Sequence, residues 1–533
     1  MIIDGRRNDD VPETSYDLVI IGAGPAGITL AHELRETGLR IALLESGGED
    51  YDDGMQALNR GRIEGNDDEY DLEFSRLRHL GGTSNHWGGQ CTPLDEIDFE
   101  RAWNGLSGWP FSRSELDPYY ARAHEYCDLG RYVYAFEELA PNDPDYRLFP
   151  EAPELETRVL RQSTPTRFGE KYREPLATSP TIDLWLWTTV THVGTDPGGP
   201  RVAVSLTPEG LERRFEGRAL VLASGAIEAT RTLLWSNQRN STAVGNGGGL
   251  LGACYMDHLA GGAAFLHATE PVREKVYWSG IETHADDGVP LHFALCPSRE
   301  TLEGTALRNV SFMPLPLSTD RAKQMQERRA KQADRSLRRL AKWVLGMDTG
   351  GELRFGEEYC RAITMTPDLV AERAIDLLGG DPVSEILLRF EAEQTPVREN
   401  KVTLDDTEVD AMGVPRPVVR WSPASDDIES VQEIARRIGI IAGREGLGRI
   451  EFETYGDDPY WGTTTAWHQM GTLRMADSPA SGVVDRNCQV FGMPDLYVAS
   501  GAVFPTVGRA NPTLTIVALS LRLADHLKES MTA

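Results

Sequence analysis

Residues 17–45, DLVIIGAGPAGITLAHELRETGLRIALLE, decide the fold of this protein. A continuous apolar run at 17–21 is typical of a strand buried in a parallel sheet, and 41–44 form a second run of this kind. Between them a glycine turn, GAGPAG at 22–27, leads into a helical pattern that extends to Arg35. A strand, a glycine turn, a helix and a second strand ending in an acidic residue predict a βαβ unit that binds a dinucleotide.

Each glycine of this turn, and the acidic residue after it, has a physical task. Gly22 permits the tight turn, Gly24 lets the backbone approach a pyrophosphate, and Gly27 lets the helix pack closely on the strand. The N-terminus of the helix then receives the phosphates. Glu45, eighteen residues past Gly27, is expected to accept hydrogen bonds from the ribose hydroxyls, and its charge disfavours a 2′-phosphate.

Composition excludes several classes of protein. The 533 residues carry a net charge of −28, which repels phosphate backbones and anionic lipids, so we expect no nucleic-acid partner. No run approaches the roughly 18 apolar residues of a membrane span. Six cysteines without a CxxC pair, and a start (MIIDGRRNDD) without the apolar segment of a signal peptide, indicate a cytoplasmic location. No metal site is predicted.

Three further segments contain turns of the same kind. The stretch LGGTSNHWGG at 80–89 surrounds one His and one Trp with four glycines, which is typical of a loop whose backbone approaches a flat or charged group. A buried strand at 219–224 enters a second glycine turn at 225–228. A third strand at 495–500 precedes a helix that opens at Asn511 and Pro512, suited to N-cap and N1. The nucleotide domain is therefore predicted to be discontinuous in sequence.

Taken together, these segments resemble the glucose-methanol-choline (GMC) oxidoreductases. The resemblance rests on GAGPAG with Glu45, on GGTSNHWGG, on LVLASGAIEATRTLL at 220–234, and on a block from Trp467 to Asp525. That last block contains WHQMGTLRM and NPTLTIVALSLRLAD in the order and at the spacing of the family, and is the most specific part. Within the family the chain is most similar to the bacterial sugar-oxidising branch that resembles pyranose oxidase.

The resemblance implies an α/β (α+β) protein of two domains. One is an FAD-binding Rossmann-like domain assembled from discontinuous segments, and the other is a substrate domain with a largely antiparallel sheet and flanking helices. The expected division gives residues 1–100, 155–260 and 476–533 to the FAD domain. Residues 101–154 and 261–475 are then expected to form the substrate domain.

The family oxidises a CH–OH group by hydride transfer to flavin N5, and His468 matches the position of its base. An imidazole with a pKa near neutrality suits that role, because the hydroxyl proton must leave as the hydride departs. Asn511 matches the second member of the catalytic pair, although an Asn-Pro step is also what a simple N-cap looks like. The two roles are compatible.

Several alternatives stay open at this level. The expected substrate is a small-molecule alcohol, namely a sugar or glycoside, and the acidic composition suggests a cationic amino sugar as an extension. The alternatives are an enzyme that oxidises a non-sugar alcohol and a non-catalytic escort or binding protein on the FAD fold. The electron acceptor could be O2, a quinone or a redox protein. FAD could be dissociable or bound covalently through His86. Asp257 and His258 resemble a family segment at the edge of the flavin domain, which we interpret as structural.

The resemblance also implies which residues contact FAD. They are Gly22, Gly24, Gly27, Glu45, Gly82, Thr83, Asn85, His86, Val190, Ala223, Gly225, Gly501, Ala502, Pro512 and Thr513.

Overall fold

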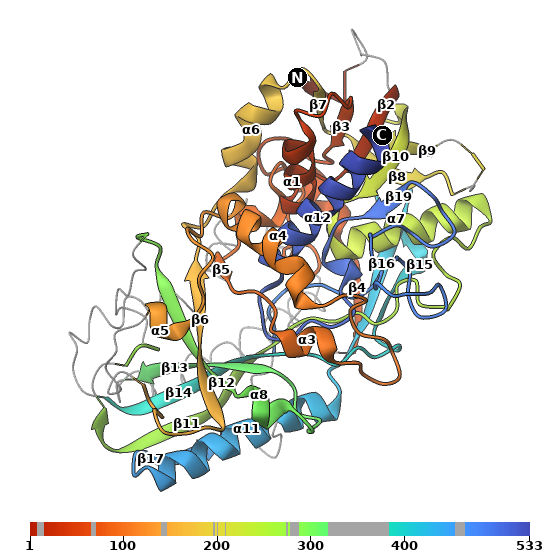
Figure 1. The fold of residues 1–533 in the computed structure, drawn as a ribbon. Helices are drawn as coiled ribbons and strands as arrows, with labels where there is room; N and C mark the ends of the chain where they lie inside the picture. The colour runs from red at the N-terminus through yellow and green to blue at the C-terminus, as the bar shows by residue number, and fades with distance from the viewer. Residues whose placement is uncertain are drawn as a thin grey trace, which may run out of the picture.

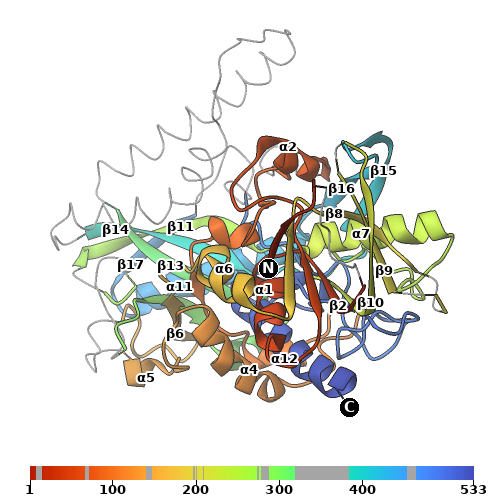
Figure 2. The same cartoon turned by 90° about the horizontal axis from the view of Figure 1, so that it is seen from above.

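A computed structural model describes residues 1–7, 15–65, 71–139, 147–195, 198–199, 201–207, 209–272, 275–277, 287–317, 383–452 and 464–532. Two large sheets lie at opposite ends of the described part, as Figures 1 and 2 show. None of the helices described is both long and apolar enough to cross a membrane.

The first large sheet is built around the βαβ unit that the sequence predicts. Its order is β1 (Ile2–Asp4), β7 (Ile182–Leu186), β3 (Ile41–Leu44), β2 (Ser15–Ile21), β10 (Glu212–Leu222), β9 (Arg201–Leu206) and β8 (Thr189–Val193), with β19 (Leu496–Val498) also paired to β10. Neighbouring strands along β1-β7-β3-β2-β10 are parallel, and so are β10 and β19. Strand β9 pairs antiparallel with both of its neighbours, β10 and β8. The apolar runs at 18–21 and 41–44 are buried, as expected for central parallel strands.

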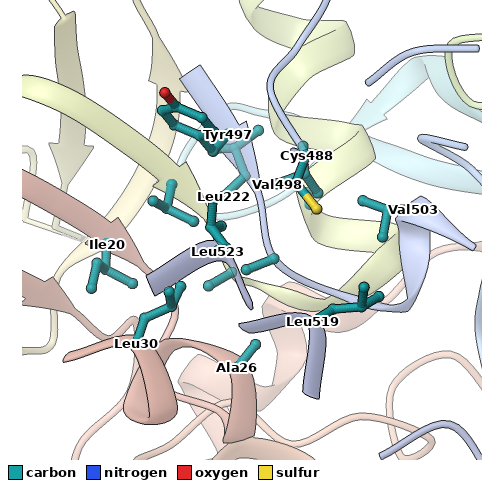
Figure 3. Close-up of a cluster of buried hydrophobic side chains, with 14 of the residues drawn as sticks. Ile20, Ala26, Leu30, Leu222, Cys488, Tyr497, Val498, Val503, Leu519 and Leu523 are labelled. Atoms are coloured by element: carbon teal, nitrogen blue, oxygen red, sulfur yellow. The ribbon is translucent and has the colours of Figure 1, made fainter. Parts of the chain in front are cut away.

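Helices from distant parts of the chain cover this sheet. Helix α1 (Pro25–Leu34) packs against α12 (Pro512–Thr532), which in turn packs against α4 (Arg113–Tyr126), while α6 (Phe168–Thr178) contacts α1 and α7 (Gly225–Asn240) contacts β8. Figure 3 shows the core that results: Leu30 of α1, Leu222 of β10 and Leu523 of α12 meet in one cluster. Burying each such side chain contributes about 1.5–3 kcal/mol, so burial in this core ties the two ends of the chain together.

The second large sheet is antiparallel throughout. Its order is β17 (Gly448–Phe452), β11 (Leu259–Val272), β14 (Val383–Ala392), β13 (Val310–Leu317), β12 (Leu291–Pro297), β6 (Leu155–Gln162) and β5 (Gln90–Cys91), with β18 (Thr464–Thr465) also paired to β11. Helix α11 (Ser425–Arg444) packs against β11, β14 and β17 through the apolar stripe of an amphipathic helix. The parallel and antiparallel sheets agree with the expected fold class.

A third, small sheet was not expected from the sequence. It consists of β15 (Lys401–Val409), β16 (Pro415–Trp421) and β4 (Arg62–Gly65), with β16 antiparallel to β15 and parallel to β4. The short elements that complete the described part are α2 (Asp53–Gln56), η1 (Ala57–Asn59), η2 (Gly82–Asn85), α3 (Glu96–Glu100), α5 (Phe136–Leu139), α8 (Arg299–Leu302) and η4 (Gly501–Val503).

Two segments lie elsewhere than the expected domain division places them. Strand β6 lies within 155–260, a segment expected in the FAD domain. It pairs with β12 from Leu155 to Arg161 and so belongs to the antiparallel sheet. Helix α4, expected in the substrate domain, packs on α12, where the Tyr120 hydroxyl lies 2.9 Å from Thr515 Oγ1. In both cases pairing with a distant partner decides the placement. The rest of the division stays a prediction.

Candidate active site

The turn between β2 and α1 shows two different uses of glycine. Gly22 has φ +110°, and a Cβ there would lie 2.7 Å from the Ala223 carbonyl oxygen. A Cβ on Gly27 would overlap the Gly22 carbonyl oxygen, so this glycine is required for the contact between helix and strand. A Cβ on Gly24, in contrast, would meet no atom of the described residues within 4 Å. Gly24 therefore faces open space at the N-terminus of α1, where a phosphate group would bind.

Glu45 directly follows β3 beside this turn and is buried, but its carboxylate can still accept hydrogen bonds from a ligand. Its Oε2 accepts a hydrogen bond from the Ala23 backbone N–H at 2.9 Å, and its Oε1 accepts one from Gly47 at 3.0 Å. Each carboxylate oxygen has a second lone pair for a ribose hydroxyl. The chain from β7 to β8 lies alongside, since the Thr188 N–H donates to the Glu45 carbonyl at 2.8 Å, and half-buried Val190 follows two residues later.

The loop at 80–89 closes over the same turn. The Gly81 N–H donates to the Ala23 carbonyl at 2.8 Å, and a Cβ on Gly82 would lie 3.1 Å from the Gly24 Cα. The expected cofactor residues Thr83 and Asn85 bond within the chain: Thr83 Oγ1 accepts from the Leu77 N–H at 3.5 Å, and Asn85 Nδ2 donates to the Leu80 carbonyl at 2.8 Å. These two side chains therefore shape the loop, and its backbone is what borders the open space.

His86 of this loop faces the segment that carries His468. Its ring centroid is 6.4 Å from that of Trp467. Burial lowers the pKa of His86 to about 4, so the ring is neutral near pH 7. Its buried Nδ1 has no hydrogen-bond partner within the part of the chain that the structure describes.

The second strand-to-helix turn, from β10 to α7, packs directly against the first. The Ala223 N–H donates to the Ile21 carbonyl at 2.8 Å, and Gly225 has φ +76° with open space where a Cβ would be. The buried Ser224 Oγ has no partner among the described residues. Ser224 was not expected at the site, because the resemblance singled out the residues on either side of it.

A buried ion cluster next to this turn was also missed by the sequence analysis. Glu228 of α7 lies 2.8 Å from Arg76, 3.0 Å from Arg78 and 3.2 Å from Arg231, and Arg231 also lies 2.6 Å from Asp410. Burial by itself would raise the pKa of Glu228, but the three guanidinium groups outweigh burial and hold that pKa well below its usual range. The cluster fastens the start of the loop that contains His86 to α7.

Gly501 and Ala502 have a different close neighbour from the expected one. A Cβ on Gly501 would lie 3.1 Å from the Gln469 carbonyl oxygen, and the Ala502 carbonyl accepts from the Leu473 N–H at 2.8 Å. Gly501 therefore has to be small where the backbone of the 467–473 segment passes it. Backbone hydrogen bonds from Gly471 and Leu473 hold that segment, which contains His468, against η4.

His468 is anchored on both its backbone and its ring. Its N–H donates to Asp257 Oδ1 at 2.8 Å, and the preceding Trp467 has φ +60°, a left-handed conformation that side chains rarely adopt. Its Nδ1 lies 2.9 Å from Nδ1 of His258, with the two rings at 89°. Burial, followed by the neighbouring His258, lowers the pKa of His468 well below its ordinary value. The imidazole is therefore neutral at pH 7, as a base must be.

Asn511 immediately precedes α12, but it does not act as the hydrogen-bonding N-cap that the Asn-Pro step suggested. Its Oδ1 is buried and has no partner among the residues that the structure describes, so it bonds none of the free N–H groups of the first turn. Pro512 and Thr513 form that first turn. The side-chain amide thus lies at the positive end of the helix with an unused acceptor.

The residues present fit a dinucleotide with a flat ring system. Open space at Gly24 and Gly225 accommodates a close backbone approach, and the N-terminus of α1 favours phosphate. Buried polar atoms without partners in the described part include Ser224 Oγ, His86 Nδ1 and Asn511 Oδ1. Such atoms are costly unless a ligand satisfies them. Among the described residues, no group of three or more His, Cys, Asp or Glu side chains could hold a metal ion.

Comparison with known proteins gives the family. A family model described as GMC oxidoreductase matches residues 396–520, the part of the chain that holds His468 and Asn511. The predicted resemblance to the GMC oxidoreductases is confirmed. The protein is accordingly an FAD-dependent oxidoreductase that acts on CH–OH groups. A second model, described as lycopene cyclase protein, matches only residues 17–52, which span the unit from β2 to β3.

Full-length relatives agree with this assignment. The chain is 23% identical to 2-methyl-1,2-propanediol dehydrogenase of Mycolicibacterium austroafricanum, over 96% of this chain and 95% of the relative. It is 24% identical to paromamine 6'-oxidase of Streptomyces fradiae, over 98% and 92% of the two chains. The crystal structure of pyridoxine 4-oxidase from Mesorbium loti superimposes with a TM-score of 0.57 at 15% identity, covering 96% of this chain and 98% of that one. The structural likeness confirms the expected fold class.

Proposed function

We propose that this oxidoreductase converts a CH–OH group of a sugar, glycoside or amino sugar to a carbonyl, with His468 as the base and Asn511 as its partner. The observation that carries the proposal is the state of His468. Its imidazole is neutral, its Nδ1 is engaged by His258, and none of the described residues hydrogen-bonds to its Nε2. A fixed, neutral imidazole with one bare nitrogen is what removal of an alcohol proton requires.

FAD, when bound, supplies the acceptor for the hydride that leaves the substrate carbon. His468 takes the hydroxyl proton as the C–H bond breaks. The Asn511 amide can hydrogen-bond the substrate oxygen, and the N-terminus of α12 favours negative charge next to it by about 0.3–2 kcal/mol. Both groups stabilise charge that develops during the reaction.

The glycine turns and the loop at 80–89 are the proposed cofactor site. The open space beside Gly24 and Gly225 supports backbone contact with FAD, and Glu45 and Val190 are proposed for the adenosine end. We propose dissociable FAD, with the His86 ring packed near Trp467 rather than bonded to the flavin. Acid precipitation tests this: yellow colour in the supernatant supports dissociable FAD, and colour that stays with the pelleted protein contradicts it.

The proposed substrate class rests on the names of the relatives. Paromamine 6'-oxidase acts, by its name, on an aminoglycoside, and it matches almost the whole chain. The strongly acidic composition would suit a cationic amino sugar. The diol dehydrogenase matches an equal share of the chain and supports a non-sugar alcohol as the second candidate.

Anaerobic reduction of the flavin tests the reaction and the substrate together. Purified enzyme is mixed with neutral sugars, glycosides, amino sugars and small diols, and bleaching of the flavin absorbance is followed. His468→Ala should keep the yellow cofactor but slow reduction by about 10² to 10⁴. Reduction at the wild-type rate in this variant would refute the role of His468.

We further propose a cytoplasmic location. The five cysteines in the described part, Cys91, Cys127, Cys254, Cys296 and Cys488, are buried free thiols, which suits a reducing compartment. The electron acceptor can be identified by reoxidising the flavin of the reduced enzyme. Rapid reoxidation by air indicates O2, whereas reoxidation by a quinone or a redox protein alone indicates a dehydrogenase.

A further inference from the structure

His258, which the sequence analysis interpreted as structural, contacts one member of the proposed catalytic pair, His468, and the backbone that leads to the other, Asn511. It follows Asp257 at the edge of β11 and is completely buried. One side of its ring meets His468, at 2.9 Å between the two Nδ1 atoms. The other side faces the backbone at 507–508, where Nε2 lies 3.4 Å from the Val507 carbonyl oxygen, four residues before Asn511.

These contacts determine which nitrogen of each ring carries the proton. A carbonyl oxygen can only accept a hydrogen bond, so His258 Nε2 must be the protonated nitrogen. A neutral imidazole has one N–H, and burial lowers the pKa of His258 to about 4, so its Nδ1 carries a lone pair at neutral pH. His468 Nδ1 must then be the donor in the contact between the two rings. His468 Nε2 is consequently left with a lone pair.

We propose that His258 is a positioning residue that holds His468 in the tautomer with a bare Nε2 and stabilises the imidazolium formed during the reaction; this rests on the proposed role of His468 as the base. The substrate hydroxyl proton moves to His468 Nε2 while the hydride leaves with its electron pair for the flavin. The His468 Nδ1–H then becomes a charge-assisted donor to His258 Nδ1. After product release, Nε2 returns its proton to solvent.

A purely structural role does not account for this arrangement. Asp257 already anchors the backbone of His468, and Gln394 in turn accepts from the Asp257 N–H at 2.8 Å. The His258 ring adds nothing to that anchor, because it contacts the His468 ring and not its backbone. Its contribution is to the orientation and protonation of the base.

Two conservative variants separate the alternatives. In His258→Asn, the amide oxygen can occupy the place of Nδ1 and still accept from His468. In His258→Gln, the longer side chain puts its amide near the place of Nε2 and leaves a carbon toward His468. We expect the Gln variant to slow anaerobic flavin reduction by about 100-fold, because a general base in the wrong tautomer loses most of a contribution of about 10² to 10⁴. The Asn variant should stay within about tenfold of wild type, with flavin content unchanged in both.

A second measurement does not depend on turnover. With ¹⁵N-labelled histidine, NMR correlations distinguish a protonated from a bare ring nitrogen, and the His468 signals are assigned from their loss in His468→Ala. We expect a protonated Nδ1 and a bare Nε2 in the wild type, and loss of that preference in His258→Gln. The proposal is overturned if His468 carries its proton on Nε2, or if the Asn and Gln variants react at the same rate. If His468→Ala itself reacts normally, the proposed function fails, and the NMR result still decides the tautomer.

Discussion

Replacing Glu228 by Gln should be one of the most damaging conservative changes in the nucleotide domain. Its carboxylate lies within 2.8–3.2 Å of Arg76, Arg78 and Arg231, and the side chains of all four residues are at most 13% exposed. The amide removes the charge that balances Arg76 and Arg78 and that shares Arg231 with Asp410. Breaking a buried ion pair from one side costs about 3–5 kcal/mol, so we expect a loss of stability of that size.

The same change should loosen the cofactor. Arg76 and Arg78 begin the segment that leads to His86, and Glu228 is the carboxylate to which both are paired. We therefore expect Glu228→Gln to lose FAD on dilution more readily than wild type, in addition to unfolding at lower denaturant concentration.

A matched control makes this prediction refutable. Glu433 also pairs with two arginines, Arg436 and Arg437, but on the exposed face of α11 with a side chain that is 36% exposed. Glu433→Gln should cost less than about 1 kcal/mol, as surface pairs do. Urea unfolding of both variants, with flavin fluorescence to follow FAD release, compares them directly. Equal losses in the two variants would refute the reasoning from burial.

Three further predictions follow from the glycines, the buried carboxylates and the net charge. Gly27→Ala should prevent folding of the nucleotide domain, because the new Cβ overlaps the Gly22 carbonyl oxygen. Gly24→Ala should fold but bind FAD weakly, because its Cβ enters the open space of the proposed cofactor site. Normal FAD binding by Gly24→Ala in a fluorescence titration would contradict that site. Burial, with nearby Asp95 and Glu393, raises the pKa of Asp98 to about 8, above its unfolded value of 3.8. The contribution of this carboxyl to the stability of the folded state therefore falls as pH rises from about 4 to about 8, by up to about 1.4 kcal/mol per pH unit. The stability of wild type relative to Asp98→Asn, measured by thermal unfolding, should fall across that range. A stability difference that is independent of pH would be the contrary result. For an amino sugar substrate, kcat/KM should fall steeply with added salt, whereas kcat/KM for a neutral sugar should change little. A flat response for both substrates would refute the proposal that the enzyme prefers a cationic amino sugar.

Local sequence predicted the parts of the site whose physical requirements are local. The overlap that makes Gly27 necessary involves Gly22, five residues away in the same turn, and the burial of 18–21 and 41–44 follows from their unbroken apolar character. The resemblance to the family directed attention to His468 and Asn511, which no local pattern would have distinguished from an ordinary buried histidine and a helix cap.

Other features depended on partners far away in the chain. Strand β6 joined the antiparallel sheet because its register matches β12, which lies about 130 residues further on. Gly501 is small because the 467–471 backbone crosses it. Asn511 Oδ1 has no partner among the described residues, where a local rule predicted a cap. The carboxylate that Arg76 and Arg78 share lies 152 residues beyond Arg76.

The sequence by itself thus determined the dinucleotide-binding unit, because that unit depends on residue type and short spacing. Its resemblance to the family implied the two kinds of sheet and the chemical class of the reaction. Only the tertiary structure placed the His258 ring against that of His468, the proposed base, and so supported a proposal about which ring nitrogen is bare. A hydrogen bond between residues 210 positions apart has no signature in either local sequence. It exists because packing brings β11 and the segment before α12 to the same place.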